Sequence, residues 1–176
     1  YRCWEDHPDR MIANELRRDN LAIANNDYVA VSFDTMLDRL NGNFFTLSPI
    51  GGRMDGQSSN DRTVSNDPNP IWLFKTGRFE GGWTAEMAIP FKSLRVQPTR
   101  EQTWGLMALR SNRWKNEVAF NVPMPPARGS GGVAMMSRAA TLVGMEVPPP
   151  GLSLDIKPFA TASLTSDRPT RVSNKA

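Results

Sequence analysis

Short stretches of alternating apolar and polar residues, separated by turn-forming residues, dominate this sequence. In Tyr28–Asp34, the side chains of Val29, Val31 and Phe33 fall on one face and the remaining residues on the other. This alternation is typical of a strand that is buried on one side. Similar segments are expected as strands at 28–34, 44–48, 71–76, 83–89, 104–110, 117–122 and 141–146. Six or more short strands predict an all-β chain folded as a β-sandwich.

Turn-forming residues set the expected hairpins and loops. The chain has 13 Gly and 14 Pro among 176 residues, which favours many turns between short strands. Glu80, Gly81 and Gly82 predict a hairpin between strands 71–76 and 83–89. Residues 1–27 are expected to be mostly loop, with a helical turn or two as the alternative within 11–20, and residues 51–69 are expected to be one long polar loop.

Charge and reactive residues exclude several classes of function. The 21 Lys and Arg are nearly balanced by 18 Asp and Glu, and no basic stripe forms, which argues against nucleic-acid binding. Cys3 has no second cysteine for an internal disulfide, and with only His7 it cannot complete a zinc site. Because His7 also has no evident nucleophile beside it, the chain is expected not to be an enzyme itself.

A proline-rich break predicts a domain boundary near the C-terminal end. Pro148, Pro149 and Pro150 followed by Gly151 interrupt any sheet, so residues 1–147 are expected to form the sandwich and 148–151 a linker. In the segment 152–176, apolar and polar residues alternate from Leu152 to Leu164. This alternation predicts either the first strand of an outer-membrane β-barrel or an edge strand of a soluble domain.

Three groups of residues resemble an amino-terminal domain of bacterial proteins in which a module similar to carbohydrate-binding family 9 precedes an outer-membrane barrel of unknown function. The first group is Asn26–Val29, Phe33–Thr35, Asp38, Arg39, Asn41, Gly42, Phe44, Phe45, Gly51, Arg53, Asp55 and Gly56; the second is Gly82–Thr84, Glu86, Ile89–Phe91, Ser93 and Leu94; the third is Trp104, Gly105 and Arg110. Together they span most of residues 1–165.

The resemblance implies a jelly-roll-like sandwich and binding of a glycan or oligosaccharide. It also implies export to the periplasm or outer membrane of a Gram-negative bacterium, a β-barrel partner in the same parent chain opened by a strand like 152–161, and further strands before Tyr1. The resemblance further implies a role in carbohydrate catabolism. If the chain is part of an enzyme, it is expected to be an accessory module of a glycoside hydrolase. The alternative function is a structural or gating cap of the barrel that binds no sugar.

Candidate sugar contacts are aromatic rings near polar groups, because a pyranose has one apolar face and many hydroxyls. Trp114 lies in a polar stretch with Arg110 and Asn112, and Trp72 is a second candidate platform. Sugar-binding members of the family hold a glucose unit between two tryptophans, one of them late in the domain, whereas the last tryptophan here is Trp114. Packing on the sandwich rim is the alternative for Trp114, and core packing is the alternative for Trp72.

Two carboxylates are candidate ligands for calcium, which some members of the wider family bind. Asp34 and Asp38, with oxygens near Asn41, lie in a turn-forming segment, and calcium takes six to eight oxygen ligands. The alternative is that both carboxylates cap the backbone of their own loop.

Overall fold

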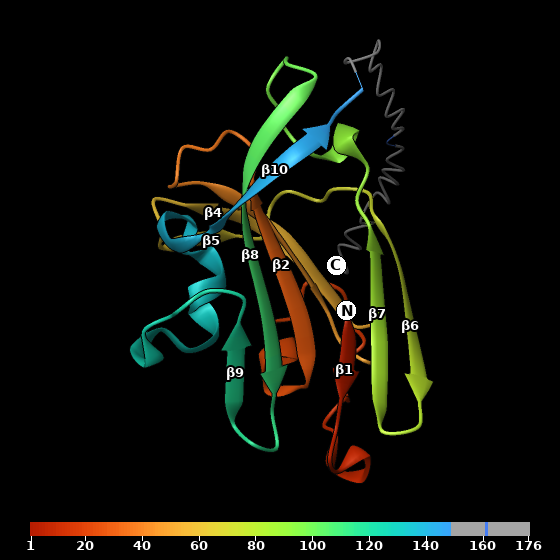
Figure 1. Cartoon of the computed structure of the whole chain (residues 1–176). Helices are drawn as coiled ribbons and strands as arrows, with labels where there is room; N and C mark the ends of the chain where they lie inside the picture. The colour runs from red at the N-terminus through yellow and green to blue at the C-terminus, as the bar shows by residue number, and fades with distance from the viewer. Residues whose placement is uncertain (149–160, 162–176) are drawn as a thin grey trace, which may run out of the picture.

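The computed structural model describes residues 1–148 and 161 of the chain, and these residues form two antiparallel sheets that face each other (Figure 1). The smaller sheet has the order β1-β7-β6. Its strands are β1 (Arg2–Trp4), β6 (Leu73–Phe79) and β7 (Gly82–Ala88). The predicted hairpin is therefore confirmed, and Gly81 at φ 80° supplies the left-handed conformation that its turn requires.

The larger sheet has the order β10-β8-β2-β3-β4-β5, and β9 also pairs with β8. Its strands are β2 (Tyr28–Asp34), β3 (Gly42–Leu47), β4 (Arg53–Ser59), β5 (Thr63–Ser65), β8 (Glu101–Asn112), β9 (Glu117–Phe120) and β10 (Ala140–Glu146). The long strand β8 uses its first half to pair with β10 and its last residues to pair with β9. The prediction of an all-β sandwich is confirmed.

The hydrophobic core lies between the two sheets. Strand β2 contributes Val29 and Val31 to it, as the alternation predicted, and the smaller sheet contributes Trp83 and Ala85. Trp104 on β8 is 2% exposed and Trp83 is fully buried, so both fill the core as expected. Burial of large aromatic side chains supplies much of the driving force that holds two such sheets together.

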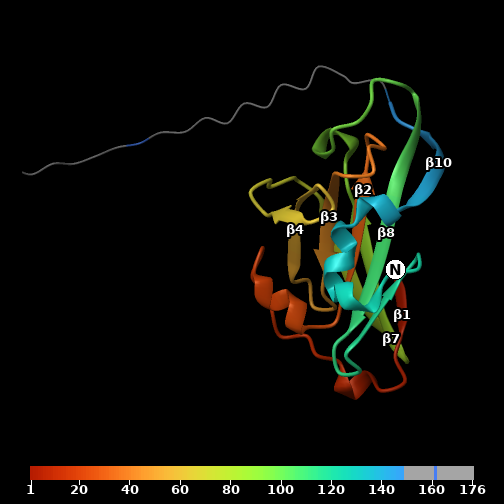
Figure 2. The same cartoon turned by 90° about the vertical axis from the view of Figure 1, so that its left-hand side faces the viewer.

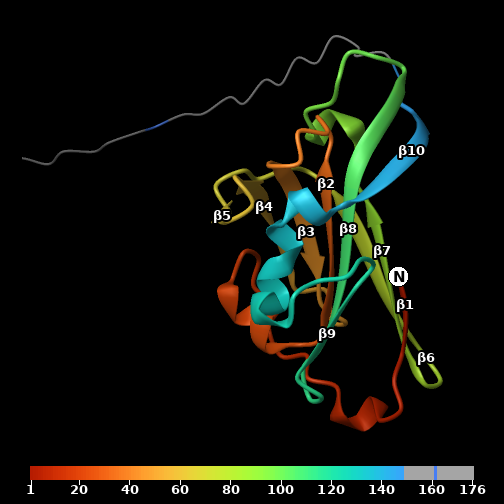
Figure 3. The same cartoon turned by 60° about the vertical axis from the view of Figure 1, so that its left-hand side comes forward.

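The outer face of the larger sheet is also covered. The chain after β9 runs across this face through the 3-10 helices η4 (Pro126–Ala134) and η5 (Met136–Arg138), as Figures 2 and 3 show. Met107 and Leu109, which point to this side of β8, are buried beneath it. Strand β8 is thus buried on both faces, whereas no described segment covers the outer face of the smaller sheet, where Trp4 is exposed.

The prediction of one long loop at residues 51–69 was wrong, because this segment contains β4 and β5. Residues 1–27 are mostly loop, as expected, and also contain β1 and the short 3-10 helices η1 (Pro8–Arg10) and η2 (Leu21–Asn25). The alternative of a helical turn within residues 11–20 is not formed. Strand β4 buries the polar side chains of Asp55 and Ser58 in place of apolar ones, which hides it from a search for apolar alternation.

The sandwich closes at Val147, which is 3% exposed and donates its backbone N–H to the carbonyl oxygen of Arg100 at 2.9 Å. The predicted strand from Leu152 to Leu164 lies outside the described residues, apart from Thr161. Within the described region of the chain, no helix is long and apolar enough to cross a membrane.

Candidate functional site

A cleft of about 200 Å³ lies between the edge of the smaller sheet and the hairpin formed by β8 and β9. We call it the hairpin cleft, and its lining residues are Trp4, Arg110, Asn112, Lys115, Glu117 and Ala119. Register explains why these side chains meet, since Arg110 pairs with Ala119 and Asn112 with Glu117 across the hairpin. Paired residues of neighbouring strands point to the same face of a sheet, so four side chains of the hairpin line one wall.

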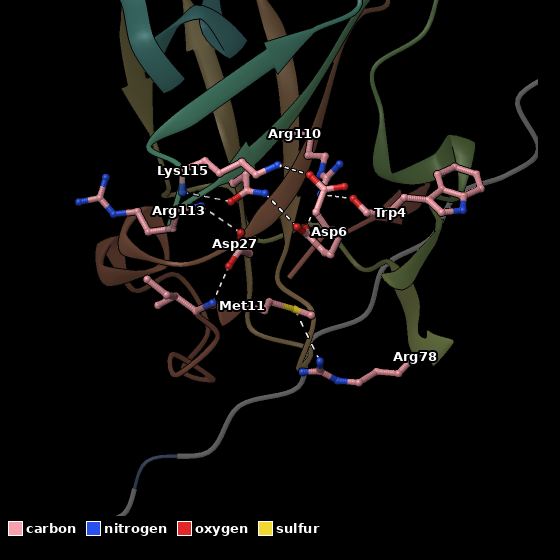
Figure 4. Close-up of polar contacts among 11 residues, drawn as sticks. Trp4, Asp6, Met11, Asp27, Arg78, Arg110, Arg113 and Lys115 are labelled. Atoms are coloured by element: carbon pink, nitrogen blue, oxygen red, sulfur yellow. Dashed lines mark hydrogen bonds and ion pairs between the residues drawn. The ribbon is translucent and has the colours of Figure 1, made fainter. Parts of the chain in front are cut away.

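A buried carboxylate organises the inner wall of the hairpin cleft. Glu5, directly after β1, is 7% exposed and accepts hydrogen bonds from the guanidinium of Arg110 and, at 2.9 Å, from Nδ2 of Asn112. Arg110 also donates to the backbone oxygen of Trp4 at 2.9 Å (Figure 4). These bonds fix Arg110 and Asn112 in one orientation, which is what a pre-formed binding wall requires.

The outer rim of the hairpin cleft carries a solvent-exposed ion pair. Lys115 Nζ lies 2.8 Å from Oδ2 of Asp6 (Figure 4), and this hydrogen bond lowers the pKa of Asp6 and raises the pKa of Lys115. The Asp6 side chain is 79% exposed, so water and salt screen the pair strongly. Lys115 can therefore exchange Asp6 for another hydrogen-bond acceptor at little cost.

Asp27 ties the loops beneath the hairpin cleft together. Its two carboxylate oxygens accept backbone N–H bonds from Ile12 at 2.6 Å and from Arg113 at 2.9 Å (Figure 4). Burial raises the pKa of Asp27, although both hydrogen bonds act in the opposite direction. The N-terminal segment and the β8–β9 hairpin, far apart in sequence, are thus held as one unit.

Trp4 is the tryptophan that sequence reasoning missed, and it is the most accessible one. Trp4 is 63% exposed. Its ring points away from Arg110, while its backbone carbonyl oxygen faces Arg110 (Figure 4). The ring meets Phe79 edge to face, with centroids 6.0 Å apart. Cys3 is buried between the exposed residues Arg2 and Trp4, which is the alternation of a strand. A strand of three residues is too short for this alternation to be recognised in the sequence.

The structure brings Arg110 and Asn112 together in the hairpin cleft, and it places the ring of Trp114 beside that cleft, outside its lining. Trp114 is half-buried, with His7 packed edge to face at 5.5 Å and Arg10 5.0 Å from the ring centroid. Its Nε1 is buried and has no hydrogen-bond partner among the described residues. These contacts match the rim-packing alternative, and the role of Trp114 in sugar binding stays a prediction.

Trp72 lies elsewhere, in the core. It is 4% exposed, its Nε1 donates to Oδ1 of Asp55 at 2.8 Å, and its ring packs against Phe45 and Phe74. No face of this ring is open to a ligand, so the core-packing alternative describes its position. Asp55 in turn accepts from Arg18 at 2.9 Å, which pins the N-terminal segment to β4.

The carboxylates of Asp34 and Asp38 face their own loop. Asp34 accepts from the backbone N–H groups of Asp38 at 3.2 Å and Arg39 at 2.7 Å. Asp38 accepts from the backbone N–H groups of Leu40 and Asn41, each at 2.8 Å, and from Nδ2 of Asn41 at 2.7 Å. Burial raises the pKa of Asp38, but these hydrogen bonds outweigh it and hold the pKa below its ordinary value. The geometry is that of loop capping, and calcium binding here stays a prediction.

A larger pocket of about 550 Å³ lies on the other side of the hairpin, beneath η4. It shares Asn112 and Glu117 with the hairpin cleft and adds polar groups from Ser111, Arg113, Asn116 and Ser130. Its apolar lining includes Phe120 and Met124. The tip of the hairpin therefore presents hydrogen-bonding groups to both of its sides.

The described residues hold no group of three or more His, Cys, Asp or Glu side chains arranged to bind a metal ion. The imidazole of His7 packs on Trp114, and the lining of the hairpin cleft includes one carboxylate, that of Glu117, while Glu5 behind it is bound to Arg110. Acid–base hydrolysis of a glycoside needs two carboxyl groups flanking one bond. The lining of the hairpin cleft offers hydrogen-bonding side chains, among them Asn112, Lys115 and Glu117.

No family model matches the chain, and no curated protein sequence matches it significantly. Among solved structures, the chain resembles a carbohydrate-binding module of family 9 from Caldicellulosiruptor kristjanssonii in complex with cellotriose. The TM-score is 0.50 and the identity is 14%, over 82% of this chain and 70% of that one. At this identity the likeness concerns the fold alone. The described sandwich therefore has a fold like that of carbohydrate-binding family 9.

Proposed function

We propose that this chain is a non-catalytic glycan-binding module whose ligand occupies the hairpin cleft and contacts Trp4. The observation that carries the proposal is the position of Trp4, a tryptophan that is 63% exposed at the border of a cleft lined by Arg110, Asn112, Lys115 and Glu117. A large aromatic side chain that is exposed in the free protein gains favourable free energy when a ligand covers it and removes its surface from water.

The chemistry of the hairpin cleft suits a sugar. Glu117 offers a carboxylate to hydroxyls, and Lys115 donates from a side chain whose present partner, Asp6, is exposed. The buried amide of Asn112 already bonds Glu5 and the backbone N–H of Lys115, and it keeps one N–H and one oxygen lone pair for a ligand. Because Glu5 already holds Arg110 and Asn112 in place, little side-chain entropy is lost when a ligand binds to them. The fold likeness to a module solved with cellotriose supports a glycan as the ligand class.

We further propose, on the sequence alone, that the module is exported and is followed in its parent chain by an outer-membrane β-barrel. The proline-rich break at residues 148–150 and the alternation from Leu152 to Leu164 support this context. The competing function, a cap of the barrel without a sugar ligand, predicts that the tryptophans are buried. Most tryptophans of the described sandwich are buried, but Trp4 is exposed beside a polar cleft, and this exposed ring favours glycan binding.

Affinity electrophoresis of the 176-residue chain tests the proposal, in gels that contain cello-, xylo- or chito-type polysaccharides. We expect retardation by at least one polysaccharide, and we expect Glu117→Ala and Lys115→Ala each to weaken it by about five- to tenfold, because each removes a hydrogen bond to the ligand. Lys92→Ala, at an exposed basic residue of the helix η3 (Phe91–Ser93), is the matched control and should migrate like the wild type.

Unchanged migration of folded wild-type chain across all gels would favour the cap function. Fractionation of cells that express the parent chain tests the proposed context, because an attached barrel would hold the module in the outer-membrane fraction. Recovery in the soluble cytoplasmic fraction would contradict export.

A further inference from the structure

We infer that the glycan bound by this module is acidic, and that Arg2 recognises a carboxylate of a sugar residue stacked on Trp4. The inference deepens the proposed function and rests on it. It concerns the open outer face of the smaller sheet, where Arg2, Trp4 and Phe79 form what we call the aromatic platform.

Register places the two rings of the aromatic platform in one row. Trp4 pairs with Gly82, and Gly82 pairs with Phe79, so a glycine separates the two aromatic residues across the sheet. A Cβ atom at Gly82 would come within 2.7 Å of Cζ of Phe79. The missing side chain therefore lets the Phe79 ring lie over β7 and reach Trp4, and the two rings form a continuous apolar surface.

Arg2 covers one side of this surface. Its guanidinium carbon lies 5.2 Å from the ring centroid of Trp4 and 4.5 Å from that of Phe79. Stacking on aromatic rings orders a guanidinium and leaves its N–H donors in the plane free for a ligand. A planar fork of this kind matches a carboxylate, which it can bind through two parallel hydrogen bonds.

The charge of Arg2 has no carboxylate partner among the residues that the structure describes. None of the six salt bridges there involves Arg2. The residue of β7 that lies opposite Arg2 is the uncharged Thr84. The guanidinium points along the sheet toward Trp4, whereas Glu86 lies on the other side of Thr84. Lys75, the other basic residue on this face, lies opposite Glu86 in the register of β6 and β7.

An exposed cation held against two aromatic rings fits a ligand that combines an apolar ring face with a negative charge. A uronic-acid residue has both, because its carboxylate replaces the hydroxymethyl group on an otherwise ordinary pyranose. A neutral sugar would use the ring of Trp4 but would leave the Arg2 fork to water. The geometry therefore assigns a preference for the charged sugar over its neutral counterpart.

The test compares two ligands that share a backbone, cellotriose and cellotriose oxidised at C6 to carboxylates, by isothermal titration calorimetry on the 176-residue chain. We expect the carboxylated ligand to bind about tenfold more tightly at low salt, the effect of one charge-assisted hydrogen-bonded pair, and the advantage to shrink as salt is added. Arg2→Gln should abolish the advantage and leave the affinity for cellotriose close to that of the wild type.

Two further variants separate the local fork from the overall charge. Arg2→Lys keeps the charge without the planar fork and should retain only a fraction of the preference. Arg138→Gln removes an equal charge from an exposed position in η5 and should retain all of it. Equal affinities for the two ligands, or a preference that survives in Arg2→Gln, would overturn the inference and leave the proposed function standing. Binding of neither ligand would overturn the inference and also count against the proposed function.

Discussion

Nδ2 of Asn112 donates a 2.9 Å hydrogen bond to Oε2 of Glu5 across 107 positions of the sequence. The second oxygen of Glu5 receives the guanidinium of Arg110, so one buried carboxylate joins the N-terminal segment to the β8–β9 hairpin. The Glu5 side chain is 2% exposed and that of Arg110 is 29% exposed. The hairpin cleft depends on this arrangement, because two of its lining side chains are held by Glu5.

Removal of Glu5 is expected to destabilise the fold. Glu5→Ala leaves the Arg110 charge and the Asn112 amide without their buried partner, which costs about 3 kcal/mol of unfolding free energy. Urea unfolding followed by tryptophan fluorescence measures this loss. Asp6→Ala is the control, because its ion pair with Lys115 is exposed and its loss should barely move the midpoint. Equal midpoint shifts for the two variants would contradict the role given to Glu5.

The buried carboxyl group of Asp55 is expected to make stability depend on pH. Burial raises its pKa above the ordinary 3.8, more than the hydrogen bond from Trp72 lowers it. The folded protein therefore binds this proton more tightly than the unfolded chain does, and wild-type stability falls as pH rises from 3.8 through the raised pKa. Asp55→Asn cannot ionise. The unfolding free energy of the wild type minus that of Asp55→Asn should thus decrease with pH over this window and then level off, whereas a pH-independent difference would contradict the account.

Gly82 is expected to be intolerant of any side chain. A Cβ atom there would come within 2.0 Å of the carbonyl oxygen of Cys3, so β1 and β7 would have to move apart. We expect Gly82→Ala to lower the unfolding free energy by about 1–3 kcal/mol. Gly131→Ala is the matched control, because a Cβ at that position meets nothing within 4 Å. Calorimetric melting of both variants checks the prediction, which fails if they melt alike.

Calcium provides a test of the loop around Asp34 and Asp38. Backbone N–H groups and the Asn41 amide occupy the carboxylate oxygens, so a calcium ion would have to displace these donors. We therefore expect the melting temperature in about 1 mM calcium to equal that in EDTA. An increase in calcium that disappears in Asp38→Asn would instead establish the metal site predicted from the sequence.

Alternation predicted those strands whose apolar side chains enter the core. Strand β2 was found because Val29 and Val31 are buried while the chain stays extended, and β7 was found through Trp83 and Ala85. Strand β4 was missed because its buried members include the polar residues Asp55 and Ser58. Asp55 accepts hydrogen bonds from the distant residues Arg18 and Trp72, and the Ser58 hydroxyl donates to the carbonyl oxygen of Gly42. Such partners are defined by the tertiary structure and leave no local pattern.

The candidate site was only partly predictable, for the same reason. Arg110 and Asn112 stood out because they form a polar stretch at the end of an apolar strand, and they do line one cleft. Trp4 could not be found, since its importance comes from Gly82 and Phe79, about 80 positions away in the sequence. The contacts of Trp114 with His7 and Arg10 are equally remote from any local signal.

Tryptophan fluorescence titration of the 176-residue chain with cello-, xylo- and chito-oligosaccharides tests the central claim most directly. Trp4 is the most exposed of the tryptophans and borders the hairpin cleft, whereas Trp114 is half-buried outside the cleft lining. We predict a saturable change in emission with at least one oligosaccharide that is lost in Trp4→Ala and kept in Trp114→Ala, while both variants unfold cooperatively. No saturable response from folded wild-type chain, or a response that persists in Trp4→Ala, would contradict glycan binding at this site.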